Sequence, residues 1–311
     1  MPAALSARLT AQQGVISTRD LRELGLSTKE RQALVSAGVL VRVRRSAFVD
    51  GQVWRDAPPW ERHRLRALAV MRGLGDQRCL VLTQHSAVAV HGFAVHGVDD
   101  LVHLGRTDAG RSRSDEVVQV QARVPEDFVQ ERHGCRLVTP AMASLQVAAE
   151  SGVEAGLVSA ESALHRQFCT SAELREALAG MPRVKGRAAA RRVVELAGAL
   201  SESAAESRCR WLFMVLGLPP PVQQAWIQDR GGVAVGRVDF LFAAERVIVE
   251  FDGLGKYADV GVLHREKIRE DRLRELGYEV VGLTWADLDE PEKVLQRIRD
   301  AMDRAAARRP R

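Results

Sequence analysis

Apolar and polar residues follow a helical spacing through the first 38 residues and a strand-like alternation after them. The segments 5–14, 17–25 and 27–38 each end in glycine, and the last two begin with Ser-Thr, a pair typical of helix N-caps. The stretch VLVRVRRSAFVD at 39–50 alternates apolar with mostly basic side chains, which predicts a half-exposed strand or hairpin. The pattern therefore predicts three short helices followed by a basic ribbon.

This order of elements is that of a winged helix-turn-helix, a DNA-binding fold. In that interpretation the segment from Thr28 to Ala37 is the recognition helix. Arg42, Arg44 and Arg45 then belong to the wing, where guanidinium groups suit contacts with phosphate. The same spacing also fits a small helical cap beside a solvated basic strand, and the sequence leaves both interpretations open.

Residues 56–195 combine strand and helix patterns, which predicts a small α/β domain with a helical connector. A Pro-Pro pair precedes its first helix, and short apolar runs between 79 and 140 predict strands, the first of which leads into a short helix. From 141 to 200 the spacing is helical. The run RVKGRAAARR at 183–192 contains five basic residues and no acid, which fits either a solvated face or a phosphate-binding stripe.

Helix and strand patterns alternate from residue 196 onward. A helix over 201–218 precedes three strand patterns, a charged helix, a further strand and a closing helix, and this order predicts an α/β sandwich with a mixed sheet. The first of these helices is expected to face the core with Trp211, Met214, Val215 and Leu218. The fold class is therefore α/β, with expected domains over 1–55, 56–195 and 196–311.

Carboxylates interrupt the two central strand patterns of this last domain, VDFLF and RVIVEF. Glu250 and Asp252 are two residues apart and share one strand face, and Asp239 reaches that face if the strands pair through the turn AAER. A lone acid on an alternating strand can simply face solvent. Several acids packed together repel one another unless a cation lies between them, and oxygen ligands of this kind suit Mg²⁺ or Mn²⁺. We therefore expect Asp239 and Glu250 to bind a metal, with Asp252 supporting it.

Basic residues near these acids fit the same chemistry. Phosphodiester hydrolysis needs an activated water and a neutralised phosphate, and Lys256 or Lys267 could orient that water or neutralise that charge. Glu206, on the preceding helix, is expected to point toward the edge of the sheet and to organise the outer shell of the metal. The alternative for Lys267 is a surface ion pair with Asp271, four residues later on the same helix face.

Composition narrows the setting of this chemistry. A net charge of +5 and an isoelectric point near 9.3 permit a nucleic-acid partner without requiring one. The cysteines are far apart without a CxxC pair, which favours a reducing cytoplasm, and no secretion signal or membrane-spanning run is expected. Four histidines have spacings that match no zinc motif and are expected to be core and turn residues: His85, His91, His96 and His103.

The C-terminal third carries a resemblance. The strings RVDFLF, RVIVEFDGLGKY and EKIREDRLRELGYEVVGLTWADL resemble the very-short-patch-repair-like endonucleases of the PD-(D/E)XK superfamily. The resemblance implies a restriction-endonuclease-like core, a divalent metal and phosphodiester cleavage. By position Asp239 matches the motif aspartate, Glu250 the motif acid and Glu206 the preceding helical acid. Asp252 stands where the superfamily has lysine, so Lys256 or Lys267 would serve as a migrated lysine.

The N-terminal half has a second resemblance. The strings GVISTRDLRELGLS, LVSAGVLVRVRRSAFV, TQHSAVAVHGF and LVTPAMASLQVAA are similar to AbiEi-type antitoxins and transcriptional regulators, in which a winged helix precedes a small α/β domain. The stretch RRSAFVD departs from that pattern, which commonly has glycine and tyrosine there, so the wing turn is expected to differ.

Two functions follow as hypotheses. The first is a Mg²⁺- or Mn²⁺-dependent DNA endonuclease that an N-terminal winged helix delivers to DNA. The second is an antitoxin-like transcriptional regulator whose nuclease fold is inactive, an alternative favoured by Asp252 at the lysine position. A structural role beside a toxin or another partner from a defence operon is the third possibility. No membrane partner is expected.

Overall fold

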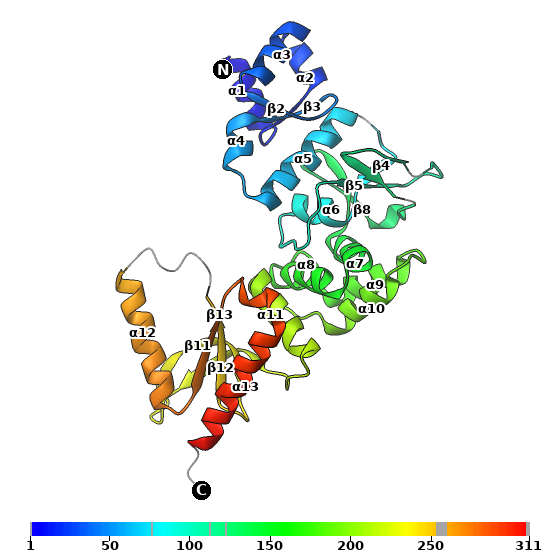
Figure 1. Ribbon diagram of the computed structural model, residues 1–311. Coiled ribbons are helices and arrows are strands. Elements are labelled where there is room, and N and C mark those ends of the chain that lie inside the picture. The colour runs from blue at the N-terminus through cyan, green and yellow to red at the C-terminus, as the bar shows by residue number, and fades with distance from the viewer. Residues whose placement is uncertain (1, 76, 112, 122, 253–259, 309–311) are drawn as a thin grey trace. The chain divides into compact units, whose positions relative to one another are not determined.

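The computed structural model describes residues 2–75, 77–111, 113–121, 123–252 and 260–308 (Figure 1). The fold is mixed α/β, as expected, and the chain divides into two compact units, Met1–Ala197 and Gly198–Arg311. This division lies beside the boundary expected near residue 195. The boundary expected near residue 55 falls inside the first unit.

The N-terminal part of the first unit contains three helices and a three-stranded antiparallel sheet in the order β1-β3-β2. Its elements are α1 (Ala3–Ala11), β1 (Val15–Ser17), α2 (Thr18–Glu23), α3 (Thr28–Ser36), β2 (Leu40–Arg44) and β3 (Ala47–Asp50). Ser17 and Ser27 cap α2 and α3, each within a reciprocal capping box. The sequence pattern missed β1, because three residues are too few to show an alternation.

Helix α5 (Pro59–Leu74), which follows the short α4 (Gly51–Asp56), joins this sheet to the rest of the unit. One side of α5 packs against β1 and β3, and it also packs against α6 and β5 of the following layer. Six of its residues are buried. The boundary expected near residue 55 stays a prediction, because the first 55 residues also have an apolar core of their own, formed by Leu5, Leu9, Ile16, Leu21, Leu40 and Phe48.

The remainder of the first unit is a mixed six-stranded sheet in the order β6-β7-β5-β4-β9-β8, with α6 and the 3-10 turn η1 between its strands and four helices, α7 to α10, after them. The strands are β4 (Leu80–Leu82), β5 (Val102–Arg106), β6 (Arg113–Ser114), β7 (Val118–Val120), β8 (Val129–Arg132) and β9 (Cys135–Val138). The helices are α6 (Gln84–His91), η1 (Glu126–Phe128), α7 (Pro140–Ser151), α8 (Val153–His165), α9 (Ser171–Gly180) and α10 (Arg187–Leu196).

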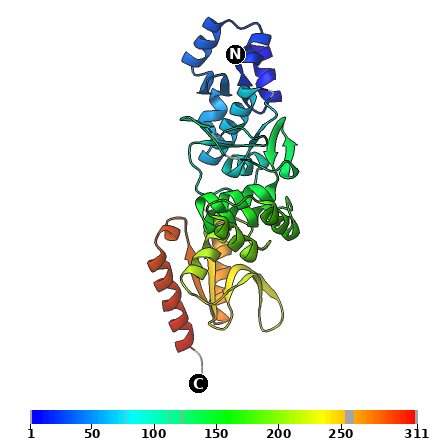
Figure 2. The same ribbon diagram turned by 90° about the vertical axis from the view of Figure 1, so that its right-hand side faces the viewer.

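The second unit is a four-stranded sheet in the order β10-β11-β12-β13, with helices on both faces (Figures 1 and 2). Only β12 and β13 are parallel, so the sheet is mixed. The elements are α11 (Ala204–Val215), β10 (Val222–Gln228), β11 (Ala234–Phe242), β12 (Val247–Phe251), α12 (Val260–Glu275), β13 (Glu279–Leu283), η3 (Asp287–Asp289) and α13 (Pro291–Ala307). Their order matches the alternation read from the sequence.

Two apolar cores define the faces of this sheet. One face packs Phe240 and Val249 against α11 and α13, and the other packs Ile248 against Leu273 of α12. Helix α11 faces its core with Ala205, Cys209, Leu212 and Phe213. The expectation for Val215 was therefore wrong: its side chain is 62% exposed, because the apolar stripe of α11 is rotated toward residues 209 and 213.

Candidate functional site

A basic concavity lies between the helices α2–α3 and the hairpin β2–β3. It has a volume of about 270 Å³, and we call it the arginine groove. Its lining residues are Thr18, Arg22, Thr28, Arg31, Gln32, Val35, Arg42, Arg45, Ser46 and Phe48. Four guanidinium groups in one concavity give a strongly positive surface that suits phosphate.

Helix α3 exposes a continuous polar face beside this groove. Lys29, Gln32, Ala33 and Ser36 are exposed, and they recur at the three- and four-residue spacing of one helix face. Arg31 is fixed at the start of the helix, because its guanidinium donates to the carbonyl of Leu26 at 3.0 Å and to Thr28 Oγ1 at 2.7 Å. The exposed face is therefore free of core contacts while its position is well defined.

The three arginines expected in the wing have different side-chain contacts. The β2–β3 register shifts between Arg42 and Arg44, and this bulge sends neighbouring side chains in different directions. Arg42 and Arg45 line the arginine groove, as expected of wing residues. Arg44 instead donates to Asp115 Oδ2 at 2.6 Å and lines a second cavity. All three arginines also line one open concavity together with Val43, so their contact with DNA stays a prediction.

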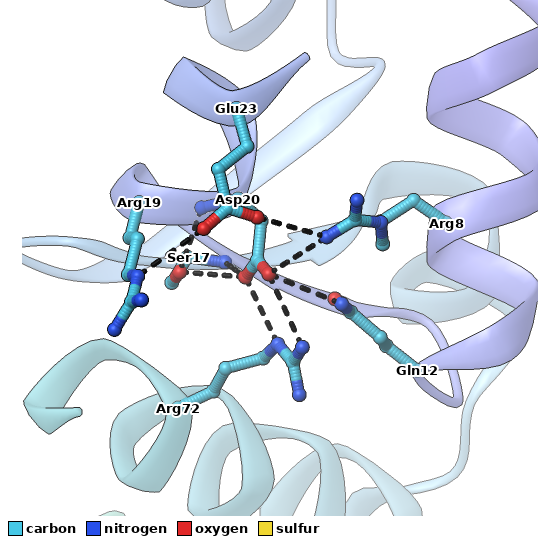
Figure 3. Close-up of polar contacts among 7 residues, drawn as sticks. All are labelled: Arg8, Gln12, Ser17, Arg19, Asp20, Glu23 and Arg72. Carbon is cyan, nitrogen blue, oxygen red and sulfur yellow. Dashed lines mark hydrogen bonds and ion pairs between the residues drawn. The ribbon is translucent and has the colours of Figure 1, made fainter. Parts of the chain in front are cut away.

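Asp20 on α2 anchors the helix pair to the rest of the unit (Figure 3). Its carboxylate is buried and accepts from the backbone N–H and Oγ of Ser17, at 2.8 and 2.6 Å. It also accepts from Nε and Nη2 of Arg72 on α5, at 2.9 and 3.1 Å, and from Gln12 and Arg8. A single carboxylate thus connects α1, α2 and α5.

Burial alone would raise the pKa of Asp20, and it is the largest single influence on that group. The hydrogen bonds from Arg72, Ser17 and Gln12 together outweigh burial and hold the pKa well below its ordinary value. Asp20 is therefore ionised at neutral pH. No sequence pattern indicated this role, because Arg72 is 52 residues away.

In the second unit, Asp239 lies where β11 and β12 separate. The last pair of their antiparallel ladder is Phe240 with Val249. One step further, Asp239 Oδ2 accepts the backbone N–H of Phe251 at 2.8 Å, so its carboxylate takes the place of a strand carbonyl. Its position is half-buried. Asp239 therefore sits in the seam between the two strands, next to the backbone of Glu250.

Glu250 is held by an arginine from α12. Both of its oxygens accept from Nη2 of Arg269, at 2.8 and 2.7 Å, and the two side chains are only 16% and 21% exposed. Such a short, shielded charge-assisted pair neutralises the carboxylate. The sequence signal missed Arg269, because the helix containing it is charged on most faces.

Asp252 lies on the same face as Glu250. Gly282 is the parallel-strand partner of Glu250, so a side chain there would point to the face that Glu250 uses. A Cβ atom at Gly282 would meet Oδ2 of Asp252 at 2.6 Å. The absence of a side chain at residue 282 thus makes room for the Asp252 carboxylate.

Glu206 is a buried acid at the start of α11. It accepts from the backbone N–H of Glu202 at 2.9 Å, from Ser203 Oγ at 2.8 Å and from Gln224 Nε2 at 2.8 Å. Gln224 reaches it from a left-handed backbone conformation with φ of 52°, in the ladder opposite Asp239. Burial raises the pKa of Glu206, and the charge of Asp239 raises it further.

The four acids therefore lie near one another, but they do not all lie on the same face of the sheet. Glu250 and Asp252 share the α12 face of the sheet, as the alternation predicts. Asp239 lies in the seam, and its charge acts on Glu206 and Cys209 of α11, on the other side. Within the described residues, no three His, Cys, Asp or Glu side chains converge closely enough to hold a metal ion.

The arrangement still offers what Mg²⁺ commonly uses. This ion binds proteins through one or two carboxylates and completes its shell with water and substrate phosphate oxygens. Asp239 commits one oxygen to Phe251 and keeps the other, while Glu250 is available once Arg269 moves to another anion. The residues present therefore fit a two-carboxylate site better than a closed protein cage.

Of the two candidate lysines, only Lys267 lies within the described residues. Lys267 lies on the exposed side of α12, two residues before Arg269. Asp271, considered as its ion-pair partner, is 3.9 Å from Arg274 Nη1. Lys256 falls outside the described residues.

Three of the four histidines considered for zinc are core residues, and the fourth, His96, is half-buried outside any helix or strand. His85, His91 and His103 are buried, together with His63 of α5. His63 Nε2 lies 2.9 Å from Ser86 Oγ, and His103 Nε2 lies 2.9 Å from Asp99 Oδ1. Burial lowers the pKa of His63 to about 4, so this ring is neutral at physiological pH. These rings fill the interface between α5, α6 and β5.

None of the helices in the described ranges has the length and apolar character needed to cross a bilayer.

Comparison with known proteins identifies relatives but no activity. The chain is 31% identical over 245 residues to the uncharacterized protein MT2308 of Mycobacterium tuberculosis (strain CDC 1551 / Oshkosh), covering 78% of this chain and 87% of the relative. The uncharacterized protein Rv2248 of Mycobacterium tuberculosis (strain ATCC 25618 / H37Rv) matches with the same identity and coverage. No family model matches the sequence.

Proposed function

The chain belongs to the same family as these two mycobacterial proteins, and we propose that it is a metal-dependent DNA endonuclease. In this proposal the first unit binds DNA through a winged helix-turn-helix, and the second unit hydrolyses phosphodiester bonds. The observation that carries the proposal is the Asp239 carboxylate in the seam beside Glu250, with a second buried acid, Glu206, in its field. Like charges placed close together repel one another unless a cation lies between them.

The arginine groove supports the DNA-binding part. Helix α3 follows α2 after a short turn, and the β2–β3 hairpin stands beside it, which is the order of a winged helix. We assign base contacts to the exposed face formed by Lys29, Gln32 and Ser36. Arg42 and Arg45 contact the phosphates on one side of α3.

The acids beside the β11–β12 seam, Asp239, Glu250 and Glu206, support the hydrolytic part, and we call them the acidic seam. Asp239 and Glu250 would hold Mg²⁺ or Mn²⁺, which supplies an activated water and neutralises charge on the scissile phosphate. Gln224 and Ser203 fix the carboxylate of Glu206, which keeps negative potential behind Asp239. Arg269 holds the charge of Glu250 and is positioned to pass to the anionic phosphate of the substrate. Lys267 adds positive charge on the same helix.

Cleavage of supercoiled plasmid tests this proposal. With Mg²⁺ or Mn²⁺ the full-length chain should convert supercoiled DNA to nicked or linear forms, and chelation should stop the reaction. The double variant Asp239→Asn with Glu250→Gln should lose cleavage while it keeps DNA affinity. Asp271→Asn, an exposed acid on α12, is the matched control and should cleave normally. Cleavage that survives the double change would remove the proposed centre.

A second candidate, a metal-independent DNA-binding regulator, is favoured by two features. Arg269 neutralises Glu250 with both oxygens engaged, and Asp252 stands at the position where the nuclease superfamily has lysine. Both features suit a nuclease fold that has lost activity. Salt-sensitive duplex binding that is unchanged by chelator, together with no cleavage under any divalent cation, would favour this candidate.

A further inference from the structure

The first unit contains a second cavity, distinct from the arginine groove, between the end of β2 and the six-stranded sheet. Its volume is about 140 Å³, and we call it the sheet cavity. Its apolar wall consists of Leu74, Leu80, Leu104, Val118 and Val120. Its polar rim consists of Arg44, Gln77, Arg106, Ser114 and Asp115.

This volume matches that of a small ligand. Protein interiors are otherwise close-packed, and an apolar cavity of about 150 Å³ accepts a single benzene ring. The wall is fixed by strand residues, since Leu80, Leu104 and Val118 are at most 6% exposed. A branched aliphatic group of four or five carbons therefore fits the sheet cavity.

The rim carries both signs of charge. Arg44 Nη2 donates to Asp115 Oδ2 at 2.6 Å, and this pair is partly exposed. The other oxygen of Asp115 accepts the backbone N–H groups of Val117 and Val118, at 2.9 and 2.8 Å, so this acid keeps its place when Arg44 moves. Arg106 is fixed by Asp108, with contacts of 2.6 and 2.7 Å. A ligand with one positive and one negative group can therefore replace the Arg44–Asp115 pair without leaving an unpaired charge.

We propose that the sheet cavity binds a free aliphatic α-amino acid of the size of leucine or valine. The side chain occupies the apolar wall, the carboxylate pairs with Arg44, and the ammonium pairs with Asp115. Such a ligand satisfies every charged group that it separates, which a simple fatty acid or amine does not. Arg106 adds a second guanidinium beside the carboxylate.

The sheet cavity and the arginine groove are lined by two neighbouring residues of the chain, Arg44 and Arg45. The bulge in β2 directs Arg44 into the sheet cavity and the adjacent Arg45 into the groove. A ligand that separates Arg44 from Asp115 moves the tip of the hairpin and with it Arg45. This coupling rests on the DNA binding proposed above. It makes the amino acid an effector that weakens DNA affinity by about fivefold or more.

Titration of the full-length protein with L-leucine, without DNA or metal, tests the site. Isothermal calorimetry should detect leucine binding, with 4-methylpentanoate and 3-methylbutylamine at least about tenfold weaker, because each lacks one charged group. Glycine, which lacks the apolar body, should not bind. A leucine concentration of about 10 mM is roughly ten times the Kd of a weak metabolite site. Failure of leucine to bind at that concentration, or equal binding of glycine, would overturn the proposal.

Variants assign the binding to this cavity. Val120→Phe fills the wall and should abolish leucine binding. Asp115→Asn preserves the volume, and it should weaken leucine about tenfold while strengthening 4-methylpentanoate, because the fatty acid no longer leaves a charged Asp115 unpaired. Asp100→Asn, which changes an exposed acid paired with Arg66, is the control and should bind as wild type does. Leucine binding that is unchanged in both Val120→Phe and Asp115→Asn would overturn the assignment of the site to this cavity.

Fluorescence anisotropy with a labelled duplex tests the coupling separately. Saturating leucine should weaken DNA binding of the wild type and leave Asp115→Asn less affected. Leucine binding with unchanged DNA affinity would overturn the coupling. A protein that binds leucine but no DNA would overturn the proposed function and the coupling, and would still support the ligand site.

Discussion

Replacing Asp20 with asparagine removes one negative charge from the point where α1, α2 and α5 meet (Figure 3). The side chain keeps its shape, but one acceptor oxygen becomes an NH₂ group that faces donors. Arg72 loses a charged partner at 2.9 Å, and Ser17 loses the acceptor for its hydroxyl and backbone N–H groups. The helix pair that carries α3 is thereby loosened from the rest of the unit.

The magnitude follows from burial. Asp20 is 6% exposed, and removing one partner of a buried charged pair typically costs about 3–5 kcal/mol. Arg72 is partly exposed and can recover some hydration, so we expect the lower end, about 3 kcal/mol. A loss of about 3 kcal/mol corresponds to roughly a hundredfold change in an equilibrium constant.

Hydrogen exchange with mass spectrometry measures this loss locally in the full-length protein. Peptides from α2 and α3 should exchange about a hundredfold faster in Asp20→Asn, while peptides from the second unit should not change. Glu23→Gln is the matched control, because Glu23 lies on the same helix as Asp20 but forms its ion pairs, with Arg8 and Arg19, at an exposed site. It should change stability by less than about 0.5 kcal/mol. Equal, small effects of both variants would refute the anchoring role of Asp20.

Three further predictions concern pH and the acidic seam. Burial lowers the pKa of three histidines to about 4: His63, His85 and His91. In the unfolded chain these rings bind protons near pH 6.5. Each therefore contributes about 3 kcal/mol to the free energy of unfolding, which is complete above pH 6.5 and is lost as the pH falls toward 4. A melting temperature that does not change over this pH range would contradict the prediction. Arg269→Gln should lower the Mg²⁺ concentration for half-maximal plasmid nicking several-fold, because Glu250 is no longer neutralised, whereas Arg272→Gln should leave that concentration unchanged. Gly282→Ala should reduce nicking about tenfold, because the new Cβ displaces Asp252, and wild-type rates in this variant would show that Asp252 has no part in the reaction.

Much of the fold was predictable from the sequence, because local signals and tertiary packing agree. The Ser-Thr pairs at 17–18 and 27–28 were expected to supply helix caps, and Ser17 and Ser27 both form capping boxes. The alternation of helix and strand from residue 196 predicted the mixed sheet of the second unit. The expectation for Val215 was wrong because all five residues from Trp211 to Val215 are apolar, so the sequence permits more than one buried stripe.

The candidate sites were less predictable, since they depend on contacts between distant segments. Alternation alone places Glu250 and Asp252 on one face, but it could not show that Asp239 leaves the ladder to bind the N–H of Phe251. Arg269 contacts Glu250 across 19 residues, and Arg44 turns toward Asp115 because of a bulge that no residue type announces. In each case a polar side chain found a partner that the sequence spacing does not encode.

Manganese binding, followed by the electron paramagnetic resonance of free Mn²⁺, tests the acidic seam most directly. The full-length protein should bind one Mn²⁺ per chain in the absence of DNA. Asp239→Asn should weaken that binding by at least about tenfold, and Asp271→Asn should not. Identical stoichiometry and affinity in the wild type and Asp239→Asn would contradict the account, because the cation would then lie elsewhere.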